Sequence, residues 1–312
     1  MTSVTEPVTL EAEPEKADAD RRLGFYLALP AQLLVLFIAV FPLLMQLYIS
    51  LTDWSPLTGM GWWNAWSLWN NFGNYLDLAV DPRWWSALGR TALVMLICVP
   101  AEFLLGLGLA ILFMDNFRVR RVFYSILLMP MMVVPAVAGY MFFMLFQSTG
   151  PLNNILSAIS GQHVAIAWLS NPTLALIAVM IADIWQWTPL MFLILLAGLL
   201  GVPDDQIKAA TLLGANWWQR FITIMLPRMK TIIVIALAIR SIENFKIFDT
   251  LWIMTGGGPG VATETISVYI YKLTANDLNW GYVAAIALVI LIVLSVALGL
   301  AIARSNRAEV AR

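Results

Sequence analysis

The sequence predicts an all-α polytopic membrane protein with six transmembrane helices. This prediction rests on its hydropathy, on six long apolar segments and on the placement of its basic residues. Of the 312 residues, 61% are hydrophobic and 12% are charged, and the mean hydropathy is +0.81. A soluble domain of this composition would expose a very large apolar surface. The net charge is −1 and the basic residues form no long run, so nothing indicates nucleic-acid binding.

Six apolar segments are each long enough to cross a bilayer, which takes roughly 20 mostly apolar residues in a helix. They are too long and too continuously apolar to be barrel strands, and an open sheet edge cannot lie in lipid. Prolines within several of them predict kinks. The segments lie at about 24–50, 87–114, 122–147, 172–200, 229–254 and 280–303.

The two ends of the chain differ from the apolar segments. Residues 1–23 are polar and acidic, which predicts a disordered tail. The first apolar segment is longer than a signal-peptide core and has no small-residue cleavage pattern, so we expect it to be retained.

Basic residues gather near both termini and after the second and fourth apolar segments, so the positive-inside rule places both termini in the cytoplasm. We expect a six-helix domain at 24–304 and a second cytoplasmic tail at 305–312.

Aromatic residues are dense in the outer loop 52–86, between the first two apolar segments. Amphipathic aromatic rings gather at membrane–water interfaces. The loop is therefore either an interfacial belt with a short amphipathic helix or a landing surface for an external partner. Its aromatic residues include Trp54, Trp62, Trp63, Trp66, Trp69, Phe72, Tyr75, Trp84 and Trp85.

Ionisable residues within the apolar segments indicate either an internal charge network or a polar path, because a charge at membrane depth faces a partner or a cavity. Glu102 and Asp183 are isolated in the sequence, whereas Arg240, Glu243, Lys246 and Asp249 recur at helical spacing. Aromatic rings and planar polar groups are suited to binding sugars. The candidate substrate path comprises Trp185, Gln186, Trp187, Glu243, Asn244, Lys246 and Asp249.

The segment 201–228 is a polar, helix-forming island between the fourth and fifth apolar segments. Asp204 and Asp205 favour the start of a helix through capping and the helix dipole. Gly214 weakens the helix centre and predicts a bend between two short helices. Small residues here permit another surface to approach closely, namely Ala209, Ala210 and Gly214. We expect the second half to be anchored at the membrane or in a partner's groove by Trp217, Trp218 and Phe221.

No catalytic motif is present. The sequence lacks a Cys or His cluster with metal-binding spacing and a phosphate-binding loop that ends in Lys-Ser or Lys-Thr. The run from Gly256 to Gly260 predicts a flexible turn, and the single cysteine, Cys98, predicts a packing residue. We therefore expect no enzymatic activity and no metal or cofactor on this chain.

Several motifs resemble the sugar-importing ABC permeases of the maltose and glycerol-3-phosphate type, specifically the first of two paired permease subunits. They are the segment Pro203–Pro227, Phe245-Lys246-Ile247-Phe248-Asp249, the glycine run with Thr263-Glu264-Thr265, and Gly281-Tyr282-Ala284-Ala285. The resemblance covers essentially the whole chain. Lys208 stands where the family usually has glutamate, which removes one contact expected with an ATPase.

The resemblance implies a type I ABC importer permease fold in the cell (inner or cytoplasmic) membrane. It implies a second permease subunit in a heterodimer, two ATPase subunits that hold ATP and magnesium, and an extracytoplasmic sugar-binding protein or lipoprotein. It also implies that a disaccharide is imported, with trehalose as the first candidate. Another oligosaccharide, glycerol-3-phosphate or ion-coupled secondary transport are alternatives. The implied ATPase-coupling loop contains Asp204, Lys208, Ala209, Ala210, Gly214, Ala215, Phe221 and Pro227.

Overall fold

The computed structural model describes residues 14–310, and within them the chain forms only helices and connecting loops. The one strand-like pairing in this range is an isolated bridge between Thr52 and Trp69. The prediction of an all-α protein is therefore confirmed. Of the disordered tail predicted at 1–23, residues 1–13 lie outside the described range, and the prediction was wrong for residues 14–23, which form the start of a helix. The chain divides into two compact units, residues 1–75 with 280–288, and residues 76–279 with 289–312.

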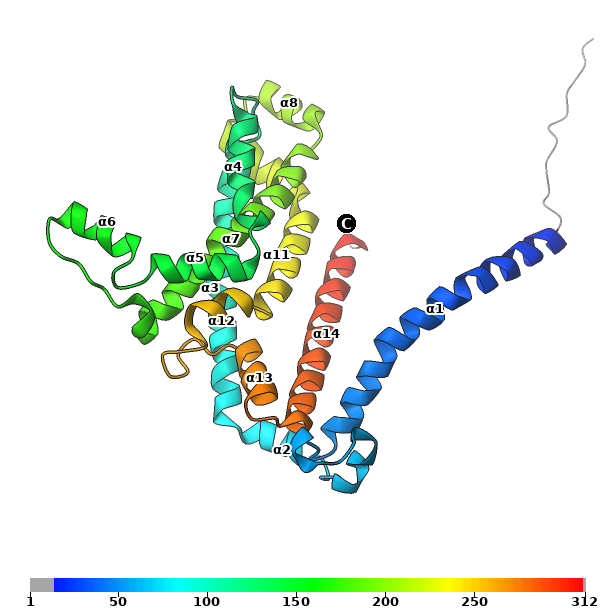
Figure 1. The fold of residues 1–312 in the computed structure, drawn as a ribbon. Coiled ribbons are helices and arrows are strands. Elements are labelled where there is room, and N and C mark those ends of the chain that lie inside the picture. Colours follow the sequence, from blue (N-terminus) through cyan, green and yellow to red (C-terminus); the bar gives the residue numbers. More distant parts are fainter. Residues whose placement is uncertain (1–13, 311–312) are drawn as a thin grey trace, which may run out of the picture. The chain divides into compact units, whose positions relative to one another are not determined.

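The first unit gathers the end of one long helix and the start of another around a loop. It contains α1 (Pro14–Ser50), the 3₁₀ turns η1 (Pro56–Thr58) and η2 (Trp62–Leu68), the first residues of α2 (Gly73–Val80) and those of α14 (Trp280–Val310) (Figure 1).

A close backbone approach fixes this loop. The side-chain amide of Asn74 donates to the carbonyl oxygens of Ser50 and Thr52 at 2.9 and 3.0 Å. The backbone N–H of Gly281 donates to the carbonyl oxygen of Trp54 at 3.2 Å. A Cβ at position 281 would lie 2.2 Å from the carbonyl oxygen of Thr52, so this approach requires glycine.

The aromatic residues of η2 are mostly turned outward. Trp62, Trp63 and Trp66 are 43%, 67% and 58% exposed, and Ala65 is the buried residue of this turn. The loop 52–86 contains the 3₁₀ helices η1 and η2 and the short α-helix α2. Both interpretations of the aromatic surface stay open.

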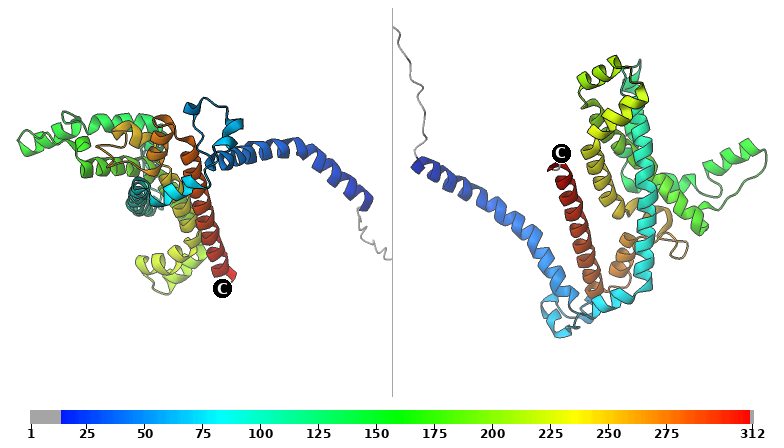
Figure 2. Two further views of the ribbon diagram at one scale, coloured as in Figure 1. Left: turned by 90° about the horizontal axis from the view of Figure 1, so that it is seen from below. Right: turned by 180° about the vertical axis from the view of Figure 1, so that it is seen from behind.

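The second unit is built on three long helices that pack side by side. They are α3 (Pro82–Leu112), α7 (Pro172–Leu200) and α11 (Lys230–Phe245), with α4 (Arg120–Met132) packed along α7 (Figures 1 and 2). Smaller elements complete it: α5 (Pro135–Leu145), α6 (Pro151–Ser160), η3 (Trp168–Ser170), α12 (Asp249–Thr255) and α13 (Ile266–Ala275).

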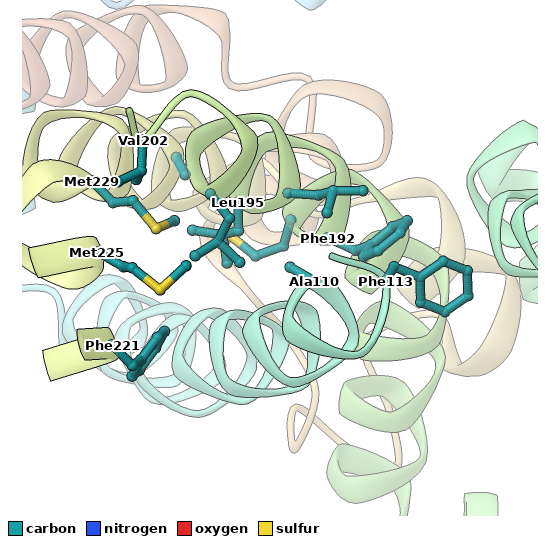
Figure 3. Close-up of a cluster of buried hydrophobic side chains, with 12 residues drawn as sticks. Ala110, Phe113, Phe192, Leu195, Val202, Phe221, Met225 and Met229 are labelled. Atoms are coloured by element: carbon teal, nitrogen blue, oxygen red, sulfur yellow. The ribbon is translucent and has the colours of Figure 1, made fainter. Parts of the chain in front are cut away.

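A buried apolar cluster holds α3, α7 and the start of α11 together (Figure 3). Phe192 and Leu195 of α7 are fully buried, and Phe113 contacts Phe192 edge-on with ring centroids 5.3 Å apart. Met229 is also fully buried. Fully burying side chains of this size stabilises a fold by roughly 1.5–3 kcal/mol each in water; inside a bilayer, close packing takes over much of that role.

Two of the predicted spans are broken. The segment 122–147 divides into α4 and α5, whose axes differ by 96°. Pro135 begins α5, and a residue before proline avoids the helical region, as Val134 does here with ψ 134°. The segment 229–254 also fails as one helix, because α11 ends at Phe245 and α12 begins at Asp249.

The number of spans differs accordingly from the prediction. Within the described residues, three helices are long and apolar enough to cross a membrane. Up to five spans result if two bent pairs each form one span, namely Arg120–Met132 with Pro135–Leu145 and Trp217–Arg228 with Lys230–Phe245. The three are Leu23–Ser50, α3 and α7. Six spans remain a prediction.

Gly106→Ala is expected to destabilise the second unit, because a Cβ there would lie 2.9 Å from the backbone nitrogen of Phe192 and 3.0 Å from Met191. Overpacking of this kind costs about 1–3 kcal/mol. Gly108→Ala is the matched control, since it lies two residues along the same helix with nothing within 4 Å. Thermal unfolding in detergent should show a lower midpoint for the first variant alone; equal midpoints would contradict the close packing of α3 on α7.

Glu264 fastens the glycine-rich loop to α3. It is fully buried and accepts hydrogen bonds from Arg83 at 2.8 and 2.9 Å and from Lys272 at 2.8 Å. Burial opposes ionisation, but these hydrogen bonds outweigh it and hold the pKa of the Glu264 carboxyl below its usual range. The expected turn is present, with Gly256, Gly257 and Gly260 at positive φ.

The stability that Glu264 contributes should be lost in acid. A depressed pKa in the folded state stabilises the protein above the unfolded-state pKa, about 4.3 for glutamate, and the contribution disappears as pH falls through the lower folded value. Glu264→Gln should therefore unfold at a lower temperature than the unmodified protein at pH 7, with a gap that narrows below pH of about 4. A gap that is constant with pH would contradict this.

Candidate functional site

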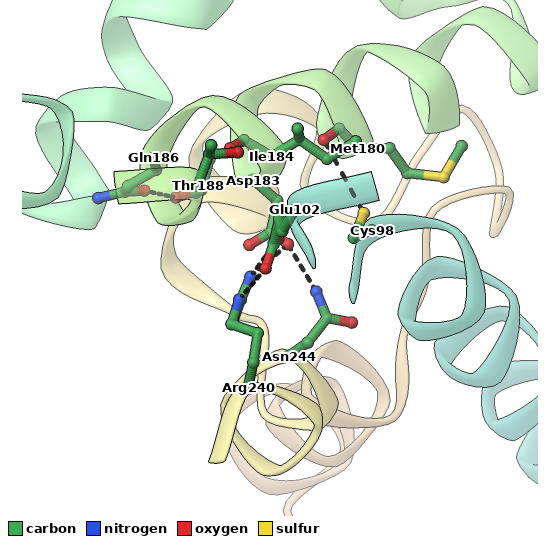
Figure 4. Close-up of polar contacts among 10 residues, drawn as sticks. Cys98, Glu102, Met180, Asp183, Ile184, Gln186, Thr188, Arg240 and Asn244 are labelled. Carbon is green, nitrogen blue, oxygen red and sulfur yellow. Dashed lines mark hydrogen bonds and ion pairs between the residues drawn. The ribbon is translucent and has the colours of Figure 1, made fainter. Parts of the chain in front are cut away.

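A network of ionisable side chains is buried where α3, α7 and α11 meet (Figure 4). Arg240 donates to both carboxylate oxygens of Glu102, from Nε at 2.5 Å and from Nη2 at 2.9 Å, and from Nη2 to Asp183 at 2.6 Å. The three side chains are 3%, 0% and 4% exposed. Asn244 donates to Asp183 at 2.6 Å. The guanidinium lies over the ring of Trp187, 5.1 Å from its centroid.

This network joins three helices through one arginine. A charge in the interior is tolerated when it is paired and hydrogen-bonded. For Glu102, Asp183 and Arg240 the internal-network interpretation is therefore confirmed. Cys98 is buried beside it, as expected for a packing residue, with its thiol 3.9 Å from the carbonyl oxygen of Met180.

The pairing expected along the fifth apolar segment is only partly present. Arg240 pairs with Glu102 and Asp183 instead of Glu243, because these carboxylates come from the neighbouring helices α3 and α7. Glu243 and Lys246 do pair, with Oε1 and Nζ 3.0 Å apart. The expected helical spacing to Asp249 was wrong, since the helix ends before it.

A cavity of about 360 Å³ lies beside the network. It brings together four residues of the predicted path: Trp187, Glu243, Lys246 and Asp249. It therefore offers an aromatic face and carboxylate oxygens that could accept hydrogen bonds from a polyhydroxylated solute. Sequence reasoning flagged Asp183 and Arg240 as ionisable but missed the rest of the lining, which is Pro135, Ile247, Phe248 and Thr250.

The other predicted path residues lie elsewhere. Gln186 is buried, donates to the carbonyl oxygen of Val133 at 2.9 Å, and thus supports the break between α4 and α5. Asn244 is fully buried within the network. Trp185 lines a separate, mostly apolar cavity of about 480 Å³ with residues such as Leu105. Consecutive helical residues point about 100° apart, so positions 185–187 cannot share one face.

The segment 201–228 forms two short helices, as predicted. They are α8 (Asp204–Leu212) and α9 (Trp217–Arg220), followed by a π-helical turn η4 (Phe221–Met225) and α10 (Leu226–Arg228). Gly214 lies between them in the left-handed region, with φ +84°.

The caps of these two helices differ from the prediction in one respect. Asp204 and Asp205 lie in the first turn of α8, where their charges suit the dipole, but Pro203 is the cap residue and no side chain caps this helix. The capping hydrogen bonds belong to α9 instead, where Asn216 and Gln219 exchange them at 2.8 Å.

Much of this segment faces outward. Leu212 and Leu213 are each 89% exposed, and Trp218 is 58% exposed. The predicted coupling residues Asp204, Lys208, Ala209, Gly214 and Pro227 are exposed, and Ala210 and Ala215 are half-buried.

Phe221 is the exception and corrects the expected anchor. It is 5% exposed and belongs to the apolar cluster with Met225 and Met229 (Figure 3). Its ring stacks against Trp217 and Trp218, with centroids 5.3 and 5.7 Å away. The expectation that Phe221 inserts into the membrane or a partner was therefore wrong. Its aromatic ring is part of the chain's own apolar core.

A bundle of apolar helices with a polar cavity beside a buried network is the architecture of a multi-pass membrane protein. Residues 102–307 match the family described as the binding-protein-dependent transport system inner membrane component, and the chain belongs to this family. It is a permease subunit of the sugar ABC importer type.

Relatives with transport names align over most of the chain. The sulfoquinovosyl glycerol permease SmoG of Agrobacterium fabrum is 34% identical, over 86% of each chain. The trehalose permease SugA of Mycobacterium tuberculosis is 33% identical, over 87% of this chain and 85% of its own. The trehalose/maltose permease MalF of Thermococcus litoralis is 32% identical, over 81% and 83%.

The fold has a counterpart among solved structures. A chain from a bacterial alginate ABC transporter, crystallised with a periplasmic protein that carries an alginate pentasaccharide, superimposes with a TM-score of 0.77 at 20% identity. The match covers 95% of this chain and 98% of that chain. At this identity the likeness shows the ABC importer permease fold alone.

Proposed function

We propose that this chain forms half of the translocation path of a binding-protein-dependent ABC importer that takes up a disaccharide, with trehalose as the first candidate. The main support for this proposal is the cavity beside the buried network. Its lining includes Trp187, Glu243, Lys246 and Asp249. An aromatic face and planar carboxylates are groups that bind a sugar's C–H face and its hydroxyls. Two relatives, SugA and MalF, are named for trehalose or trehalose and maltose transport, which supports this choice.

The proposal includes six spans in the inner or cytoplasmic membrane with both termini in the cytoplasm. A second permease subunit completes the path, an extracytoplasmic binding protein or lipoprotein delivers the sugar, and two ATPase subunits bind ATP with magnesium. The segment 201–228 docks on an ATPase. Its support is the exposure of Leu212 and Leu213, since apolar side chains that project this far from a polar helix indicate a partner surface.

The chain's part in this mechanism is mechanical rather than catalytic. Closure of the ATPase subunits displaces the docked segment, and the helices rearrange so that the cavity opens to one side and then to the other. The break between α11 and α12, at Lys246–Phe248, lies in the cavity wall. Irregular backbone is tolerated at membrane depth where it is buried in protein or lines a water-filled cavity. A break in the cavity wall fits the second case.

Reconstitution tests the proposal directly. The chain is co-expressed with its companion permease, ATPase and binding protein, placed in lipid, and ATP hydrolysis is measured with trehalose, maltose and glycerol-3-phosphate in turn. Stimulation by trehalose alone supports both the ABC importer class and trehalose as the substrate. Stimulation by another of these solutes replaces trehalose and retains the class. Uptake that follows an ion gradient without ATP would favour a secondary transporter and contradict the proposal.

A further inference from the structure

The cavity that contains the predicted path residues carries more acidic than basic groups. Three carboxylates line it, those of Asp183, Glu243 and Asp249, against the two cations Arg240 and Lys246. A fourth carboxylate, that of Glu102, binds Arg240 from behind the lining. The balance stays negative even if one of these carboxyls holds a proton.

Both cations of the cavity are already paired with carboxylates. Arg240 gives three hydrogen bonds to Glu102 and Asp183, and Trp187 covers one face of its guanidinium. The Nζ of Lys246 lies 3.0 Å from Glu243. Arginine and lysine side chains hold phosphate or sulfonate groups through charge-assisted hydrogen bonds, and both cations here already make such bonds to carboxylates.

Asp249 adds to the negative charge of the cavity. Its side chain lines the cavity from the first turn of α12, and within the described residues no lysine or arginine nitrogen lies within 4.0 Å of it. A free carboxylate accepts hydrogen bonds from sugar hydroxyls and repels a phosphate or sulfonate.

We propose that this half of the path selects uncharged sugars against anionic ones, and that the Glu243–Lys246 pair sets the selection by neutralising the cavity's only exposed lysine. The inference rests on the proposed function of the cavity as the path. It separates the candidate substrates by charge: neutral disaccharides fit the lining, whereas glycerol-3-phosphate and sulfonated sugars do not.

A matched pair of ligands tests the selection. The assembled permease–ATPase complex is placed in lipid nanodiscs without the binding protein, so that the binding protein's own selectivity does not enter. Equilibrium binding is then measured for radiolabelled trehalose and for trehalose 6-phosphate, which share a scaffold and differ in the phosphate. We expect the unmodified complex to bind the neutral sugar at least about tenfold more tightly, a ratio that corresponds to a modest electrostatic preference.

Two variants should change the ratio of the dissociation constants for trehalose 6-phosphate and trehalose in opposite directions. Glu243→Gln leaves Lys246 unpaired in the cavity and should reduce the preference for the neutral sugar by about tenfold. Lys246→Gln removes the cation and should increase it. Asp77→Asn is the control, because it removes one negative charge from an exposed residue of α2 that does not line the cavity, and should leave the ratio unchanged.

Each outcome has a distinct meaning. Equal binding of the two sugars would overturn the selection while leaving the cavity as the path. Binding of neither sugar by the assembled complex would overturn the path and the selection with it. A shift with Asp77→Asn as large as that with Glu243→Gln would overturn the local role of the Glu243–Lys246 pair.

Discussion

Gly214→Asp is expected to abolish sugar uptake while the protein still inserts into the membrane. Position 214 has φ +84°, where a side chain costs roughly 1–2 kcal/mol, and the new carboxylate would lie beside Leu212 and Leu213 on the proposed docking face. Nothing lies within 4 Å of a Cβ here, so the fold itself has room for the change. The measurement is uptake of labelled sugar, with the amount of permease in the membrane fraction determined in parallel.

Gly214→Asn separates the charge from the shape. Asparagine has nearly the same size as aspartate and tolerates the left-handed conformation, but it is neutral. We expect it to retain more uptake than Gly214→Asp. Equal loss in both variants would assign the effect to the backbone or to bulk, and normal uptake by Gly214→Asp would remove the coupling assignment.

Arg240→Met is expected to prevent accumulation of a folded protein. The substitution leaves the buried carboxylates of Glu102 and Asp183 side by side with no cation, and losing one partner of a buried ion pair costs about 3–5 kcal/mol. Methionine fills part of the volume and cannot donate. The measurement is the yield of monodisperse protein in detergent, followed by its thermal unfolding.

Glu102→Gln is the milder comparison. It keeps the contact between Arg240 and Asp183 and can still accept a hydrogen bond from the guanidinium, so we expect a smaller loss of stability than with Arg240→Met. Arg240→Lys should fall between the two, since an ammonium group cannot reproduce the two-pronged contact with Glu102. An Arg240→Met protein as stable as the unmodified one would contradict the structural role of the network.

The sequence was sufficient where composition alone determines the outcome. Helices α3 and α7 correspond to the second and fourth predicted spans, because a continuous apolar run of that length has few alternatives. The prolines of the third apolar segment predicted a kink, and the structure has a full break there, where Pro135 excludes Val134 from the helical region. No proline or glycine marks the end of α11 at Phe245, although the polar residues Glu243, Asn244 and Lys246 interrupt the apolar run there.

The site was predictable in kind but not in detail. Charges within apolar segments pointed correctly to Glu102, Asp183 and Arg240, but which carboxylate meets the arginine depends on how α3 and α7 pack, and sequence spacing within one segment carries no such information. Phe221 shows the same limit. Its neighbours Trp217 and Trp218 are equally aromatic and are exposed, whereas Phe221, at the start of the π-helical turn, is buried.

The burial of Phe221 has a mechanical consequence. Phe221, Met225 and Met229 are packed among side chains of α3 and α7, so the exposed segment is anchored to the bundle by apolar packing. Close-packed interiors have low compressibility and transmit strain. On the proposed function, a displacement of α9 by a docked ATPase would therefore pass directly to the long helices through this packing.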